Sequence, residues 1–206
     1  MSTMVLAKRY VDTPIAMDHL EPVRRRIREA PIGLPMPPWT RLAVHAVGGL
    51  TEVGYADDTD LLLVVSSLGR GVINCRTGER VARNRDAIND RRYDCRRLRA
   101  LGIGPLEGCP IRLAGLHGGG LLNSGRDGWW VNQITLNWPE VNLLLGGPWG
   151  WIYDGKTPFV KLGIEREVRA FGFSDTGETF VLATSSDLTV YAWKENIVSS
   201  ATASPQ

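Results

Sequence analysis

The sequence predicts an all-β domain of short antiparallel strands, preceded by an extended N-terminal arm that contains one short helix. The chain of 206 residues holds 23 Gly and 12 Pro, which separate many short apolar runs, a pattern typical of short strands joined by turns. A chain of this length is long enough to bury a sizeable core. We expect residues 1–40 to form the arm, 41–195 a single β domain and 196–206 a flexible tail.

The arm contains a helix candidate and a proline-rich segment. Residues 18–30 are expected to form a short helix with Asp18 as its cap and with Val23 and Ile27 four residues apart on one face. Residues 30–39, APIGLPMPPW, carry too many prolines for a helix or a central strand. They are therefore expected to lie as an extended strap on the domain.

The next segments read as strands joined by tight turns. Residues 42–47 form a strand candidate, and residues 54–75 contain two further apolar runs. The turn at 76–79, RTGE, leads into Val81 and Ala82 and predicts a hairpin. The arginine-rich residues 83–99 that follow, RNRDAINDRRYDCRRLR, are expected to form a charged surface loop or, in the sharper interpretation, a docking loop that includes Arg91 and Arg92.

A glycine-rich turn follows the strand candidate at residues 111–116. His117 and the three glycines after it resemble the oxyanion loop of esterases of the α/β-hydrolase class. That family also requires a G-x-S-x-G nucleophile motif, which does not occur in the chain, and an alternation of strands and helices. The glycines are therefore expected to form a turn, and His117 is kept as the centre of an alternative, hydrolase reading.

Residues 129–151 form the richest aromatic region and hold five of the seven Trp residues. The alternation over residues 129–135 predicts a strand with at least one indole facing outward. Residues 149–153 are expected to form another strand, which leads into an Asp-Gly turn and a return strand from Phe159 to Leu162. Exposed Trp beside Arg126 and Asp127 would suit a protein-binding surface, because Trp and Arg supply large contact area and directional hydrogen bonds.

The stretch around which the chain is organised is residues 171–193, FGFSDTGETFVLATSSDLTVYAW. It predicts strands at 179–183 and 188–193, separated by turns rich in Asp, Ser and Gly. The segment resembles the core of a WD-repeat β-propeller blade. The resemblance implies a small or irregular β-propeller-like fold, or a related two-sheet antiparallel domain. Lys194 stands where that family has the Asp of its Trp-Asp pair, and no Gly-His pair opens the unit.

Residues 54–75 align with residues 172–193 without a gap, at an offset of 118 residues. Tyr55 falls on Phe173 and Val72 on Val190 in this alignment. The offset is close to three units of about 40 residues, the span of a propeller blade. Four blade-like units would then fit within the β domain.

Composition argues against several other classes of protein. The formal net charge is only +2, and 20 of the 24 basic residues are Arg, a bias that indicates a GC-rich bacterial genome more than a nucleic-acid surface. No apolar run approaches the roughly 18 residues that span a bilayer, and the first residues lack the apolar region of a secretion signal, so we expect a cytoplasmic protein without membrane contact. Cys75, Cys95 and Cys109 have no metal-ligand spacing and are expected to be reduced.

Together these observations favour a non-enzymatic module that binds another protein, such as an immunity-type antagonist or an assembly subunit. No catalytic residue, metal or other cofactor is assigned, and oligomers could form through exposed β edges. One alternative is a hydrolase with its site near His117. Another is nucleic-acid binding through residues 24–28 and 91–99, which the low net charge disfavours. The predicted protein contacts are Arg91, Arg92, Arg126, Asp127, Trp129, Trp130, Trp149 and Trp151.

Overall fold

The structure is a computed structural model that describes residues 18–85, 93–94 and 96–194. In these ranges one α-helix, α1 (Glu21–Glu29), precedes fifteen strands, and the prediction of an all-β domain behind a helix-bearing arm is confirmed. The strands are β1 (Trp39–Ala46), β2 (Leu50–Tyr55), β3 (Leu61–Ser66), β4 (Gly69–Asn74), β5 (Glu79–Asn84), β6 (Tyr93–Asp94), β7 (Arg99–Leu101), β8 (Pro110–Arg112), β9 (Ala114–Gly115), β10 (Trp130–Asn137), β11 (Glu140–Gly146), β12 (Phe159–Glu165), β13 (Val168–Phe173), β14 (Thr179–Thr184) and β15 (Asp187–Trp193). Three short 3-10 turns complete the described chain: η1 (Gly104–Leu106), η2 (Arg126–Gly128) and η3 (Ile152–Asp154).

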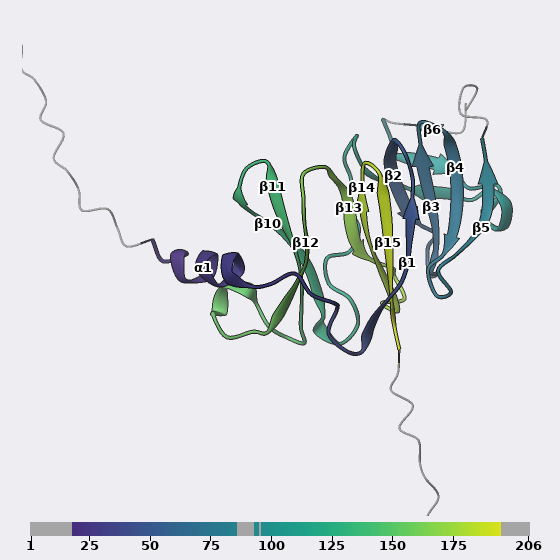
Figure 1. Cartoon of the computed structure of the whole chain (residues 1–206). Coiled ribbons are helices and arrows are strands. Elements are labelled where there is room, and N and C mark those ends of the chain that lie inside the picture. Colours follow the sequence, from purple (N-terminus) through teal and green to yellow (C-terminus); the bar gives the residue numbers. More distant parts are fainter. Residues whose placement is uncertain (1–17, 86–92, 95, 195–206) are drawn as a thin grey trace, which may run out of the picture.

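The described strands form four antiparallel sheets and no closed barrel, so the two-sheet version of the prediction is replaced by four sheets. We name them by their strand order: sheet I is β10-β11-β12, sheet II is β1-β15-β14-β13, sheet III is β5-β4-β3-β2-β9 and sheet IV is β6-β7-β8. Figure 1 shows them following one another from α1, beside sheet I, to β4 and β5 of sheet III at the far end. The molecule is therefore an open row of sheets.

Neighbouring sheets in the row are joined by apolar cores. Val131 of sheet I and Phe180 of sheet II belong to one buried cluster. Val53 of sheet III and Val181 of sheet II belong to the next, and Leu63 of sheet III packs in a third cluster with residues of sheet IV. Each fully buried side chain of this kind stabilises the fold by about 1.5 to 3 kcal/mol relative to an exposed one. The order of the sheets is thus set by packing between their faces.

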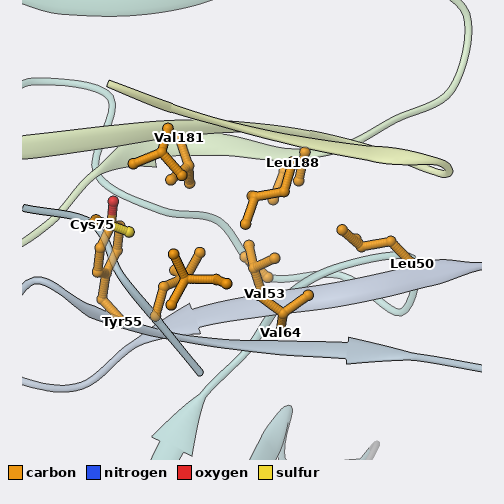
Figure 2. Packing of buried hydrophobic residues seen from close by; sticks show 13 residues of the cluster. Leu50, Val53, Tyr55, Val64, Cys75, Val181 and Leu188 are labelled. Carbon is orange, nitrogen blue, oxygen red and sulfur yellow. The ribbon is translucent and has the colours of Figure 1, made fainter. Parts of the chain in front are cut away.

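The core between sheets II and III is drawn in Figure 2. Leu50, Val53 and Val64 of sheet III point toward Val181 and Leu188 of sheet II. All five side chains are at most 5% exposed. Val181 and Leu188 are distant in sequence from Leu50, Val53 and Val64, so this core holds β14 and β15 against β2 and β3.

A buried carboxylate joins the same two sheets. Asp60, which is 8% exposed, precedes β3 in sheet III. Its Oδ1 accepts hydrogen bonds from the hydroxyls of Ser174, Thr176 and Thr179 at 2.8, 2.9 and 2.7 Å. Buried polar groups need such partners, because leaving one unsatisfied costs about 1 to 3 kcal/mol. Asp60 therefore anchors the β13–β14 turn of sheet II onto sheet III.

The 118-residue offset seen in the sequence recurs in the strands. β13, β14 and β15 begin at residues 168, 179 and 187, each 118 residues after β2, β3 and β4, which begin at 50, 61 and 69. The order of these three strands is also the same in both sheets. Sheets II and III thus contain the same three-stranded unit, and membership in the WD-repeat family remains a prediction.

The fourth strand of the unit has a different origin in each sheet. In sheet III, β5 follows β4 directly, with Arg80 opposite Ile73 and Arg83 opposite Gly71. In sheet II, the N-terminal strand β1 takes that place beside β15. Both fourth strands carry a bulge at the corresponding point, after Arg80 in β5 and after Arg41 in β1. The two ends of the β domain therefore meet in sheet II.

The arm follows the prediction except at the start of its helix. Val23 and Ile27 are buried in α1, and they pack with Leu144 of sheet I because apolar residues four apart share one helix face. The proline-rich segment lies extended, and Ile32 forms a bridge with β12. The prediction of Asp18 as the helix cap is wrong. The cap is Leu20, whose N–H donates to the Asp18 carboxylate at 3.0 Å.

A second prediction is wrong at residues 149–153, where a strand was expected. This segment forms a loop that ends in η3 (Ile152–Asp154). Trp149 has a φ of 58°, in the left-handed region that a strand cannot contain. Elsewhere in the described chain, the expected hairpin after residues 76–79 and the return strand from Phe159 are present. None of the described helices has the length and apolar character needed to cross a membrane.

Candidate functional site

Four of the predicted contact residues line one pocket of about 540 Å³ beside sheet I. Trp130, Trp149 and Trp151 supply indole rings, and Asp127 supplies a carboxylate. We call this site the tryptophan pocket. Its other lining residues are polar or small, with one aliphatic pair: Asn123, Ser124, Gly125, Gly128, Val131, Asn132, Gly150 and Ile152. The pocket therefore has aromatic walls and hydrogen-bonding groups.

One wall is a short hairpin that leads into β10. The Val131 N–H donates to the Asn123 carbonyl at 2.9 Å, and the Gly125 N–H donates to the Trp129 carbonyl at 2.8 Å. Arg126 at the tip forms an ion pair with Glu178 of the β13–β14 turn, and its guanidinium lies 5.1 Å from the centre of the Trp193 ring. Arg126 thus anchors the hairpin to the neighbouring sheet and is not among the residues that line the pocket.

The other wall is the loop that carries Trp149. Its N–H donates to the Gly128 carbonyl at 3.1 Å, so the loop is tied to the hairpin. The φ angles of Trp149 and Asp127 are 58° and 53°. Such angles in non-glycine residues cost about 1 to 3 kcal/mol and cluster at functional sites. Gly128 makes this approach possible, because a Cβ there would lie 2.6 Å from the Trp149 ring.

Trp151 is held by a network in the turn that follows it. Its N–H donates to the Thr157 hydroxyl oxygen at 3.0 Å. The Asp154 carboxylate accepts hydrogen bonds from the Thr157 hydroxyl and from the N–H groups of Thr157 and Lys156, and these hold the pKa of Asp154 well below its usual range. The Thr157 carbonyl also accepts a hydrogen bond from Arg26 of α1. The arm therefore supports the aromatic loop from behind.

The indoles differ in exposure. Trp149 is 84% exposed and Trp151 is 61% exposed, whereas the Trp130 ring lies against Gly146 and is only partly exposed. Trp129, also predicted as a contact, is 6% exposed and packs in the core between sheets I and II. Arg91 and Arg92 lie outside the described residues. The surface that a partner can reach is thus concentrated at Trp149 and Trp151.

A second polar cluster surrounds His117. Its Nδ1 contacts the carboxylate of Glu52 and lies 2.9 Å from the Tyr93 hydroxyl. Glu52 is buried, whereas the His117 side chain is 47% exposed. A carboxylate that orients an imidazole is one part of a hydrolytic site, but a nucleophile and an oxyanion site would also have to meet there. Within the described ranges, no three His, Cys, Asp or Glu side chains are grouped to hold a metal ion.

The arginines of α1 are largely engaged within the protein. Arg24 pairs with Asp18, and Arg28 lies 3.4 Å from Glu21. Arg26 turns inward, where its guanidinium lies 4.8 Å from the centre of the Phe159 ring. Phosphate contacts require free basic side chains, so the helix gives little support to nucleic-acid binding.

Sequence reasoning missed the residues that position the pocket. Asp154 and Thr157 carry no motif beyond the Asp-Gly turn, which predicts a turn but not its contact with Trp151. Asn123, Ser124 and Asn132 reach the pocket because the hairpin folds back on β10. No protein-family model matches the chain, and the search of curated proteins found no significant match.

Proposed function

We propose that the protein is a non-enzymatic protein-binding module whose tryptophan pocket receives an apolar or aromatic side chain of the partner. The observation that carries this proposal is the exposure of two indoles that the fold holds in place: Trp149 at 84% and Trp151 at 61%. A large apolar side chain gains free energy when it leaves water, at roughly 25 cal/mol per Å² buried. A partner that covers both rings would therefore be stabilised by the burial of their apolar surface.

The pocket has the composition of a protein-binding hot spot. Such sites combine buried aromatic anchors with polar groups that fix the orientation of the partner. Asp127, Asn123 and Asn132 lie among the lining residues and offer acceptors and amide donors. Because the hydrogen bonds from Trp151 and Trp149 to the surrounding chain already order the loop, little conformational entropy is lost on binding. An immunity-type antagonist or an assembly subunit would each use such a preformed surface.

The experiment is a pull-down with the full chain from the cells that make it, with bound proteins identified by mass spectrometry. The test variant combines Trp149→Asn with Trp151→Ala, since Asn tolerates the left-handed backbone at position 149. The control is Trp138→Ala, because Trp138 is 85% exposed and does not line the pocket. A partner captured by the wild type and by the control, but not by the pocket variant, supports the proposal. Equal capture by all three proteins contradicts it.

A hydrolase is the second candidate, and the contact between Glu52 and His117 favours it. A buried carboxylate can orient an imidazole as a general base. This candidate predicts hydrolysis of activated esters that is lost in His117→Ala but kept in Trp149→Asn. The same activity in wild type and His117→Ala would exclude this site.

A further inference from the structure

The repeated unit creates two grooves at equivalent positions. One lies between sheet III and the end of β1 in sheet II, and the other lies between sheet II and sheet I. The groove on sheet III has a volume of about 200 Å³ and is lined by Val64, Gly71, Ile73, Arg80 and Arg83, with Ala46 to Gly48 opposite. The corresponding groove on sheet II is lined by Leu182, Thr189, Tyr191, Arg41 and Val44. The strand registers place these two sets of residues at matching positions. The two grooves can therefore be compared residue by residue.

The two grooves differ in charge. The groove on sheet II contains Arg41 together with the carboxylates of Glu165 and Asp187. The groove on sheet III contains Arg80 and Arg83, and none of the described residues that line it is a carboxylate. A charge without a counter-ion attracts one of opposite sign, and a concave surface strengthens this field. The groove on sheet III is thus the one suited to an anion.

Two backbone features build the cationic groove. The bulge after Arg80 shifts the register of β5, so that Arg80 and Arg83, three residues apart, lie opposite Ile73 and Gly71. Without a bulge, residues three apart in a strand would face opposite sides of the sheet. Gly71 occupies the position of Thr189 in the other groove, and the missing side chain leaves space in front of Arg83. The two arginines therefore lie next to the space that Gly71 leaves open.

Arg70 also borders the groove, but its guanidinium donates to the Leu101 carbonyl of sheet IV at 2.5 Å. Its guanidinium is therefore directed toward sheet IV, and we do not count it among the ligands. The two guanidiniums of Arg80 and Arg83 match the charge of a doubly ionised phosphoryl group, and Arg donates two parallel hydrogen bonds to phosphate oxygens. Val64 and Ile73 offer an apolar floor for a few carbon atoms.

We infer that the groove on sheet III binds a doubly ionised phosphate group, with Arg80 and Arg83 as its ligands. A volume of about 200 Å³ is below the roughly 300 to 1,000 Å³ of sites for larger ligands. The group therefore enters as free phosphate or as the phosphoryl end of a small molecule or side chain. This site is separate from the tryptophan pocket, and its test is independent of protein binding.

The test is calorimetric titration of the full chain with inorganic phosphate and with O-phosphoserine, using sodium chloride as the ionic control. The first variant is Arg83→Val, which copies Val44 of the other groove and removes one guanidinium. The second is Gly71→Thr, which copies Thr189 and fills the space while both arginines remain. A Cβ on Gly71 would lie 3.4 Å from the Ala82 carbonyl oxygen, an ordinary contact, so this variant should fold. Arg41→Gln in the groove on sheet II is the matched control.

The expected result is binding to wild type and Arg41→Gln, with a loss of about 10- to 100-fold in affinity in Arg83→Val, since one charge-assisted interaction is removed. Gly71→Thr should show a similar loss. Tighter binding of phosphoserine than of phosphate would identify a phosphorylated molecule as the source, and equal binding would identify free phosphate. Absence of binding to the wild type, or binding by Arg83→Val and Gly71→Thr that is as tight as binding by the wild type, would overturn the inference.

Discussion

Replacing Asp60 by Ala should weaken the contact between sheets II and III and lower the stability of the fold. The Asp60 Oδ1 atom accepts three hydroxyl hydrogen bonds of 2.7 to 2.9 Å from sheet II. A hydrogen bond to a charged group contributes about 1.5 to 3 kcal/mol, but the three share one oxygen and are not additive. We therefore expect the free energy of unfolding to fall by about 3 to 5 kcal/mol, less than the sum of three such hydrogen bonds. For a chain of this size that lowers the melting temperature by about 10 °C.

Urea unfolding followed by tryptophan fluorescence measures this loss. The matched control is Asp57→Ala, because Asp57 belongs to the same turn and is exposed. Surface changes of this kind shift stability by about 0.5 kcal/mol or less. Asp60→Asn should lie between the two, since the amide keeps one acceptor oxygen but loses the charge. Equal stability of Asp60→Ala and Asp57→Ala would refute the view that this carboxylate joins the sheets.

Three further predictions concern Cys75 and His117. In a Cys95→Ser background, a thiol reagent should label exposed Cys109 in the native protein and buried Cys75 only after unfolding, as read by peptide mass spectrometry. Burial raises the pKa of the Cys75 thiol from its ordinary 9.0 to about 12, so its contribution to stability is complete below pH 9 and is lost as the pH rises toward 12. The urea midpoint of the wild type should therefore fall relative to that of Cys75→Ala over this range, and parallel pH curves would contradict the assignment. His117→Ala should destabilise the fold by about 2 to 3 kcal/mol, because Glu52 loses its partner, and adding Glu52→Gln should restore part of the loss in the same urea assay.

Local sequence patterns were sufficient for much of the fold. The expected strands at 179–183 and 188–193 correspond to β14 and β15, because alternating apolar residues and Gly or Ser turns act over a few neighbours. The pairing of β1 with β15 could not be predicted in this way. It joins residues about 150 positions apart, and its register depends on which faces become buried together.

The candidate site was predictable in composition but not in geometry. The clustering of Trp coincides with the region that forms the tryptophan pocket, yet Trp149 and Trp151 alternate with a glycine just as they would in a strand. The left-handed backbone of Trp149 arises from its contact with Gly128, which is distant in sequence. Arg126, a predicted contact, forms an ion pair with Glu178 of the β13–β14 turn, which the sequence could not predict. Tertiary contacts therefore decided which of the predicted residues reach the surface.

We propose that the tryptophan pocket binds a protein partner. The most direct measurement of this binding is the affinity of the purified partner, by calorimetry, for the wild type, for the double variant Trp149→Asn with Trp151→Ala, and for Trp138→Ala. Aromatic hot-spot residues contribute about 2 kcal/mol or more, so the double variant should bind at least about 30-fold more weakly. Trp138→Ala should bind like the wild type. An unchanged affinity in a folded double variant would contradict the account.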